Sequence, residues 1–424
     1  MKKSRYNITV DNGLEYVIAN TMTGAIVKLS SNEWQDYLAG NFTDDFWREN
    51  GLVVDDELDE LDLLKRVYEA AHNNKHSARI TICPTLDCNF SCPYCYERRE
   101  KGRMSEIIQE GVLKKVRQLY EMGIEKIYIT WYGGEPLLCK DIISYMSKSI
   151  IKIAEDNGRQ CQFAIITNGY LIDKDIVNLF REIKMKSIQI TLDGNKEMHD
   201  KRRKRIDGAP TFDVIVNNIK MLLEAGLHVN IRVNVDSDNI DGYNIVRQYF
   251  EQYTNVNCYP AFVTEEKTQN VIQRAKCIKN SMRSSILKKF EIDYRNIDME
   301  KVMTPEVGMC MANHKHSYVF SYNGNIYKCI NDVSIPQNAV GNIMTGVVHD
   351  EGNYYNYDAF NEEGCSMCSY LPMCYGRCAW EYKEKGERSC PDIKYLLKDI
   401  LRYKYLGKEE IYNGNYSETA EIRQ

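Results

Sequence analysis

Cys88-Asn-Phe-Ser-Cys92-Pro-Tyr-Cys95 places three cysteines in the spacing C-x-x-x-C-x-x-C, with an aromatic residue just before the last. Four thiolates usually hold a [4Fe–4S] cluster, so three would leave one iron open. A catalytic zinc keeps an open position in the same way, by having only three protein ligands. A zinc knuckle or a chance spacing is the alternative, but no histidine or fourth cysteine lies nearby in sequence to close a zinc site. The spacing therefore favours a cluster whose open iron can bind a small molecule and pass it an electron.

This stretch resembles the cluster loop of the radical S-adenosylmethionine (SAM) superfamily. In that family the open iron chelates the amino and carboxylate groups of SAM, and electron transfer cleaves SAM to a 5′-deoxyadenosyl radical that abstracts hydrogen. The resemblance implies that Cys88, Cys92 and Cys95 form the catalytic centre and that Tyr94 lies at the cofactor.

The composition is that of a globular chain of 424 residues, with 43% hydrophobic and 27% charged residues. A net charge of −5 argues against a dedicated nucleic-acid partner. We find neither an apolar signal segment nor a run long enough for a membrane helix, so we expect a cytoplasmic protein. Fifteen cysteines in such a compartment indicate metal ligation. Five scattered cysteines instead read as buried apolar residues: Cys83, Cys139, Cys161, Cys258 and Cys277.

Residues 1–76 read as a separate N-terminal domain. Three short strands are expected within residues 5–29, followed by a helix capped by Ser31, a helix over 43–49 and an acidic helix over 57–72. This order resembles the winged-helix leader-recognition domain of peptide-modifying enzymes, which binds a peptide by adding a strand to a sheet edge. The alternative is a plain extension that covers one end of the next domain.

Residues 77–285 alternate between strands and helices, which predicts an α/β fold with a parallel sheet. Six such units fit a partial (β/α)6 TIM-like barrel, which is also the fold of the radical SAM family. In parallel barrels the chemistry lies at the carboxyl ends of the strands. We expect strands at 79–83, 126–131, 162–167, 187–192, 228–235 and 255–262, and helices at 105–122, 141–156, 174–181, 212–225 and 243–253.

The second barrel strand ends in Trp131-Tyr-Gly-Gly-Glu-Pro136. Gly133 and Gly134 allow close backbone approach, and Glu135 supplies a carboxylate for a cationic ammonium. The segment resembles the family motif that holds the SAM amino group, although Gly-Gly-Glu-Pro on its own is more often a turn.

Further polar residues follow the later strands. Thr167-Asn168-Gly169 and Thr191-Leu-Asp193-Gly194 suit ribose hydroxyls or a carboxylate and resemble the family's polar contacts. Arg203 and Arg232 could each meet the SAM carboxylate through a charge-assisted hydrogen bond. The run Lys201–Arg205 could also be only a solvated loop.

After a bridging region, residues 286–309, a second set of cysteines begins, and a hairpin with its turn at Asn323-Gly-Asn325 is expected between the first two. The seven spacings resemble the SPASM domain, with two auxiliary [4Fe–4S] clusters, over residues 310–395; two zinc ribbons are the alternative. Residues 396–424 would form a helix and a tail. By the family assignment the outer cluster is held by Cys365, Cys368, Cys374 and Cys390, and the inner one by Cys310, Cys329 and Cys378.

The inner set is one thiolate short. Cys258, Cys277, His314 or His316 could complete it, or the iron could stay open for a substrate thiolate. We favour the open iron, because ligation would deprotonate and hold a substrate cysteine.

The sequence thus predicts an enzyme with SAM and three [4Fe–4S] clusters that modifies a ribosomally made precursor peptide carrying a leader. The resemblance is to thioether-forming maturases of the sactipeptide and ranthipeptide type, served by an electron donor such as flavodoxin or ferredoxin. Rivals are a sulfatase maturase that makes formylglycine, another radical peptide modification (a C–C or C–O crosslink, or epimerisation), and a non-catalytic iron–sulfur electron-transfer protein.

Overall fold

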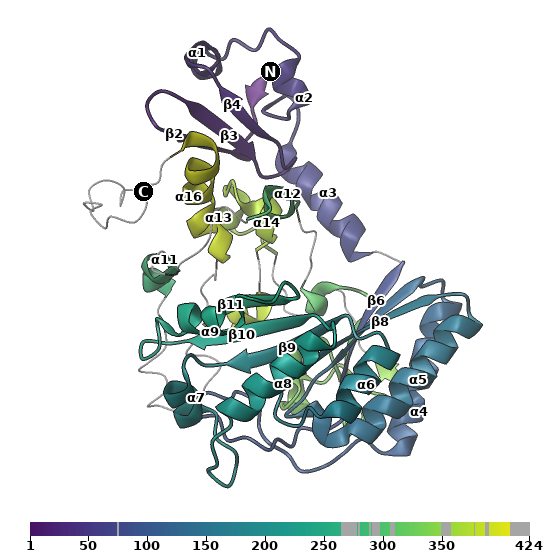
Figure 1. Cartoon of the computed structure of the whole chain (residues 1–424). Coiled ribbons are helices and arrows are strands. Elements are labelled where there is room, and N and C mark those ends of the chain that lie inside the picture. Colours follow the sequence, from purple (N-terminus) through teal and green to yellow (C-terminus); the bar gives the residue numbers. More distant parts are fainter. Residues whose placement is uncertain are drawn as a thin grey trace.

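A computed structural model describes residues 1–73, 76–263, 278, 280–287, 290, 297–305, 310–348, 358–376, 378–385 and 390–407. Its centre is a sheet of six neighbouring parallel strands in chain order, which confirms the predicted α/β alternation (Figure 1). The strands begin and end within two residues of the expected positions. They are β6 (Ser77–Cys83), β7 (Lys126–Trp131), β8 (Gln160–Thr167), β9 (Ser187–Leu192), β10 (Val229–Val235) and β11 (Val256–Phe262).

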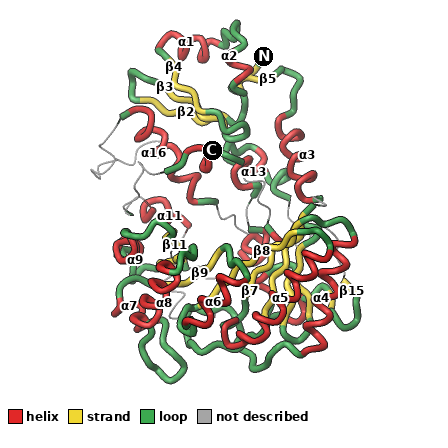
Figure 2. Tube along the Cα trace, turned by 45° about the vertical axis from the view of Figure 1, so that its right-hand side comes forward, coloured by secondary structure: helices red, strands yellow, loops and turns green. Residues whose placement is uncertain are grey.

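Helices between these strands cover one side of the sheet (Figure 2). Each turns an apolar stripe toward the strands; in the first, Val112, Leu113 and Val116 are buried in the same core as the strand residues Ile80 and Ile129. The helices are α4 (Glu106–Glu121), α5 (Lys140–Asp156), α6 (Lys174–Glu182), α8 (Phe212–Glu224) and α9 (Gly242–Phe250), with the short helices η1 (Pro136–Cys139) and α7 (Lys196–Arg202) at strand ends.

The sheet continues beyond β6 into the C-terminal part of the chain. β12 (Ser317–Ser321) pairs in parallel with β6 and antiparallel with β13 (Asn325–Tyr327), so the expected hairpin is present. β14 (Gly341–Asn342) and β15 (Val347–Val348) extend it. The C-terminal part therefore shares a sheet with the parallel unit.

The N-terminal region has the three strands and three helices expected from sequence. β2 (Asn7–Asp11), β3 (Tyr16–Asn20) and β4 (Ile26–Leu29) form an antiparallel sheet, and β1 (Lys2–Lys3) pairs with β5 (Val53–Val54). The helices are α1 (Ser31–Ala39), α2 (Phe46–Glu49) and α3 (Glu60–His72).

Two helix starts differ from the prediction. The cap of α1 is Ser30 and not Ser31, because Ser30 and Glu33 form a reciprocal capping box. Helix α3 starts at Glu60 and not at 57, because the Asp59 carboxylate accepts hydrogen bonds from the first free N–H groups.

C-terminal elements lie between the N-terminal sheet and the parallel unit (Figure 1). Helix α16 (Asp392–Leu406) packs against β2 and β3, and its Leu397 and Leu401 share a core with Ile8 and Val10. The other elements are α11 (Asn280–Leu287), α12 (Met299–Met303), η4 (Met311–Asn313), η5 (Ile330–Asp332), η6 (Pro336–Asn338), α13 (Glu363–Ser366), α14 (Leu371–Cys374) and α15 (Ala379–Lys385). In the part of the chain that is described, no helix is both long and apolar enough to cross a bilayer.

Candidate active site and cluster sites

A cavity of about 380 Å³ opens at the carboxyl ends of the parallel strands. The loop after β6 supplies one wall, and the ends of β7 to β10 supply others, as expected for a parallel α/β unit. Most of the site residues predicted from sequence line it together: Cys88, Cys92, Tyr94, Cys95, Gly133, Gly134, Thr167, Asn168, Thr191, Arg203 and Arg232.

The two glycines after β7 let the backbone pass directly beneath the cysteine loop. A Cβ on Gly133 would lie 2.2 Å from the Thr85 carbonyl oxygen, and one on Gly134 would lie 2.3 Å from that of Asp87. Gly133 also has a φ of +119°, which favours glycine. The Gly-Gly pair therefore joins the cysteine loop to the next strand end.

Glu135 lies behind the cavity wall and does not line it. Its carboxylate is fully buried and accepts the Thr167 hydroxyl at 2.7 Å and the Asn168 N–H at 2.7 Å. A third bond comes from the N–H of Leu137 at 3.0 Å. Glu135 thus connects the ends of β7 and β8, and its burial raises its pKa against these hydrogen bonds.

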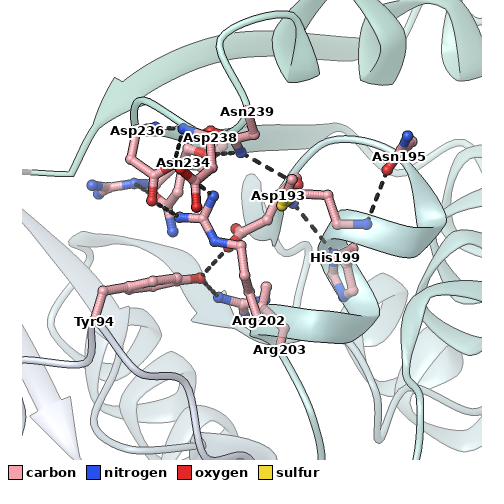
Figure 3. Close-up of polar contacts among 12 residues, drawn as sticks. Tyr94, Asp193, Asn195, His199, Arg202, Arg203, Asn234, Asp236, Asp238 and Asn239 are labelled. Carbon is pink, nitrogen blue, oxygen red and sulfur yellow. Dashed lines mark hydrogen bonds and ion pairs between the residues drawn. The ribbon is translucent and has the colours of Figure 1, made fainter. Parts of the chain in front are cut away.

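Asp193 also lies behind the cavity, where it positions the aromatic residue of the cysteine loop (Figure 3). The Tyr94 hydroxyl donates to Asp193 Oδ2 at 2.7 Å and accepts from Arg203 at 2.8 Å. The Arg202 guanidinium lies 3.3 Å from Asp193 and 2.9 Å from Asp236. The cysteine loop is therefore attached to the ends of β9 and β10 by buried charges.

The alternative reading of 201–205 as a solvated run is wrong for its two central arginines. Arg202 and Arg203 are 6% and 7% exposed. Arg203 lines the cavity, and its Nε has no hydrogen-bond partner among the described residues. A buried guanidinium with a free N–H at a cavity suits an anionic ligand such as a carboxylate.

The sequence analysis missed several residues of this cavity. Asn234 and Gln189 follow from strand periodicity, because they lie two residues from Arg232 and Thr191 on the same strand faces. No pattern indicated Tyr96, Glu97, Tyr132, Ile330 or Asn331.

Glu97 is a carboxylate buried in the cavity wall. Burial raises its pKa to about 7, against a smaller lowering by the nearby Tyr132 hydroxyl. Tyr96 and Tyr132 share a hydrogen bond beside it.

The cysteine loop fits a cluster by its donor set. Its three cysteines are free thiols at one cavity. Burial raises the pKa of Cys88 to about 12 and that of Cys95 to about 11, so binding iron would have to displace their protons. Within the described ranges no three His, Cys, Asp or Glu side chains converge as a single-ion site. A cubane takes each thiolate on a different iron and so needs a wider spacing.

The four cysteines expected at the outer cluster lie near one another. Burial raises the pKa of Cys374 to about 11, and Cys368, Cys365 and Cys390 are each close enough to raise it further. Lys394 belongs to this group, because its ammonium donates to the Cys390 sulfur at 3.5 Å.

The expected inner set gathers in an adjacent core that contains Cys329, Cys310 and Cys378. Burial raises the pKa of Cys310, and the nearby Cys378 adds to the rise. Cys329 directly precedes Ile330 and Asn331, which line the cavity, so the set is connected to the cavity wall through this residue.

The sequence left four side chains that could complete the inner set. Cys258 packs against the core of the parallel unit and not against this group. Cys277 lies outside the described residues. His314 is buried, and its Nδ1 accepts the N–H of His316 at 3.2 Å.

Comparison with known proteins identifies the class. Residues 82–246 match the model of the radical SAM superfamily. The chain therefore carries a radical SAM domain over these residues. A serine-type anaerobic sulfatase-maturating enzyme of Bacteroides thetaiotaomicron is 23% identical over 360 residues, covering 74% of this chain and 86% of the relative.

Two solved structures share the fold. Native anSMEcpe with bound AdoMet has a TM-score of 0.63 at 19% identity, covering 78% of this chain and all of its own. Streptococcus suis SuiB bound to precursor peptide SuiA has a TM-score of 0.50 at 14% identity, covering 91% of this chain and 97% of its own.

Proposed function

We propose that this radical SAM enzyme modifies a ribosomally made precursor peptide by forming intramolecular thioether crosslinks at cysteine. The observation that carries the proposal is the position of Cys329, which shares a core with Cys310 and Cys378 and directly precedes Ile330 and Asn331 in the wall of the cavity. A substrate cysteine bound there would lie beside the carbon that reacts. Positioning would do most of the work, because a radical reacts with the group nearest to it.

The cavity residues have roles that follow from their chemistry. Cys88, Cys92 and Cys95 would hold a [4Fe–4S] cluster with one open iron, and Arg203 and Arg232 would bind the carboxylate of SAM. Thr167, Asn168 and Thr191 offer polar groups for ribose, and the carbonyls around Gly133 and Gly134, with Glu135 behind them, face the ammonium. When bound, the cluster and SAM would supply radical chemistry, with the electron coming from a flavodoxin- or ferredoxin-type donor.

The other seven cysteines would hold two auxiliary clusters, so that the enzyme binds three in all. The proposed ligands are Cys365, Cys368, Cys374 and Cys390 at the outer one, and Cys310, Cys329 and Cys378 at the inner one, whose fourth position stays open for a substrate thiolate. An auxiliary cluster supplies an acceptor for the surplus electron of crosslinking.

A peptide substrate is supported by the extent of the structural likeness. The anSMEcpe structure leaves about a fifth of this chain uncovered, whereas SuiB, solved with a precursor peptide, covers 91%. The N-terminal sheet β2–β3–β4 has the strand edge that leader binding by strand addition needs. We assign leader recognition to residues 1–76.

Formylglycine formation is the second candidate, because the Bacteroides relative is a sulfatase-maturating enzyme that aligns over 74% of this chain. The two reactions leave different products. Formation of a thioether removes two hydrogen atoms from the peptide and consumes the thiol. Conversion of cysteine to formylglycine instead replaces the sulfur by an aldehyde oxygen.

The test is anaerobic incubation of the reconstituted enzyme with SAM, reductant and the small cysteine-containing peptide encoded next to its gene. We expect the peptide to lose two hydrogens per modified cysteine and to resist alkylation, by mass spectrometry. An aldehyde that reacts with a hydrazine probe would establish the second candidate instead. Intact peptide together with intact SAM would reject both, and would leave an electron-transfer protein.

A further inference from the structure

Lys394 lies next to a proposed cluster ligand, and the predicted mechanism gives it no role. Helix α16 begins at Asp392, two residues after Cys390, and Lys394 is in its first turn. The lysine Nζ reaches back to the Cys390 sulfur and donates to it at 3.5 Å. The side chain is only partly exposed.

The position of this lysine is set by the packing of its helix. Leu397 and Leu401, one and two turns further along α16, are buried against the N-terminal sheet, and the Lys394 N–H donates to the Pro391 carbonyl at 3.0 Å. Both fix where the helix begins relative to Cys390. Cys368, another member of the same set, is also close enough for its charge to act on Lys394.

Hydrogen bonds to ligating sulfurs and nearby positive charge are two of the factors that set the reduction potential of an iron–sulfur cluster. Both stabilise the reduced form, because reduction adds one negative charge to the cluster. We propose that Lys394 is a positioning residue that raises the potential of the outer auxiliary cluster by donating to the Cys390 sulfur. This inference rests on the proposed function, which assigns Cys390 to that cluster.

The energy involved is large enough to measure. A hydrogen bond from a charged donor is stronger than one between neutral groups, and reduction of the cluster strengthens it further. Loss of the Lys394 contact should therefore lower the ratio of reduced to oxidised outer cluster roughly tenfold at a fixed potential, a shift of about 59 mV for one electron.

The experiment is an anaerobic redox titration of the full-length, iron-reconstituted protein, followed by electron paramagnetic resonance, with dithionite as titrant. Lys394→Gln removes the charge and replaces the ammonium by a shorter, neutral amide, whereas Lys394→Arg keeps a charged donor. Lys398→Gln removes a charge one turn later on α16 at an exposed position and is the matched control.

We expect one midpoint potential to fall in Lys394→Gln, with full iron content, and to stay near wild type in the other two variants. Loss of a single cluster in Lys394→Gln would show that the lysine holds the cluster in place and would overturn the proposed effect on its potential. Equal potentials in all four proteins would overturn it, as would an equal shift in Lys398→Gln. A wild-type protein with no cluster at Cys390 would overturn it together with the ligand assignment, and iron analysis distinguishes that result from the others.

Discussion

The two cysteine groups of this protein are built in opposite ways. Cys88, Cys92 and Cys95 lie in one loop, which follows β6 and is held by the glycine turn beneath it and by neighbouring strand ends of the same sheet. The C-terminal seven come from segments that spread over 80 residues and are brought together only by packing. That packing includes the far end of the chain, because Arg5 donates to the Ser366 carbonyl and accepts from the Ser369 hydroxyl.

The difference determines how each group depends on the rest of the fold. The first group needs the parallel sheet and its strand ends. The second also needs the N-terminal sheet, whose Tyr6 shares a core with Leu371 and Tyr375. Changes at the N-terminus should therefore affect the C-terminal group and spare the loop.

The largest effect is expected from the simultaneous change of Cys88, Cys92 and Cys95 to Ala. SAM cleavage should fall to background, because no thiolate would remain to hold the cluster that supplies the electron. The measurement is 5′-deoxyadenosine release under dithionite. Cleavage at the wild-type rate would show that the loop is not the catalytic centre. Replacing Cys161, a cysteine outside both groups, by Ala is the control.

Tyr94→Phe should weaken SAM binding several-fold while the iron content stays normal. The change removes two hydrogen bonds, at 2.7 and 2.8 Å, and leaves Asp193 and Arg203 without their shared partner. The readouts are KM for SAM against kcat, and the change in the electron paramagnetic resonance signal on adding SAM. Tyr170→Phe is the control, because its hydroxyl also accepts from an arginine, Arg205, but does not line the cavity. Equal KM values in both variants would disprove the positioning role.

Arg5→Ala should destabilise the C-terminal cysteine group and leave the cysteine loop unaffected. Losing the contacts to the loop between Cys365 and Cys368 should cost about 1 kcal/mol of local stability, because a partly buried carbonyl loses its donor. Chelation by a soluble iron chelator should then remove the auxiliary iron faster, while SAM cleavage stays unchanged. Arg48→Ala, which breaks an exposed ion pair within the N-terminal region, serves as the comparison. Faster loss of the loop cluster instead would contradict the division into two groups.

The smallest expected effect is on the pH dependence of stability, through His314. Burial, followed by the charge of Arg79, lowers the pKa of His314 from 6.5 to about 4. The folded state therefore favours the neutral ring, so the stability from this group is complete above pH 6.5 and is lost as the pH falls toward 4. In metal-free protein at pH 5, the free energy of unfolding of His314→Gln should exceed that of wild type by at most about 2 kcal/mol. An identical pH dependence in both proteins would argue against this account.

The parts of the fold that could be predicted were those with local signals. The six strands followed from apolar runs, and the cysteine loop and Gly133-Gly134 from spacing and conformational freedom. The pairing of β12 with β6 could not be predicted, because strands more than 200 residues apart carry no local signal of their register.

At the site, most of the predicted polar residues at strand ends lie together at one cavity, but the sequence did not indicate which of them face it. Asp193 and Glu135 point away from the cavity, where each accepts a hydrogen bond from a buried hydroxyl group. Arg202 also points away from the cavity and pairs with Asp193. The orientation of these side chains depends on which charged groups lie next to them in the folded protein, and the sequence alone does not specify those neighbours. Tyr132 and Glu97 line the cavity, and their positions likewise depend on tertiary contacts.

The most direct test of the central claim is iron and sulfide analysis combined with Mössbauer spectroscopy of the anaerobically reconstituted protein, before and after replacing Cys88, Cys92 and Cys95 by Ala. The division of ten cysteines into three and seven predicts about twelve irons per chain in wild type and about eight in the variant, all in cubane clusters. Bound zinc, or a single cubane that disappears entirely in the variant, would contradict it.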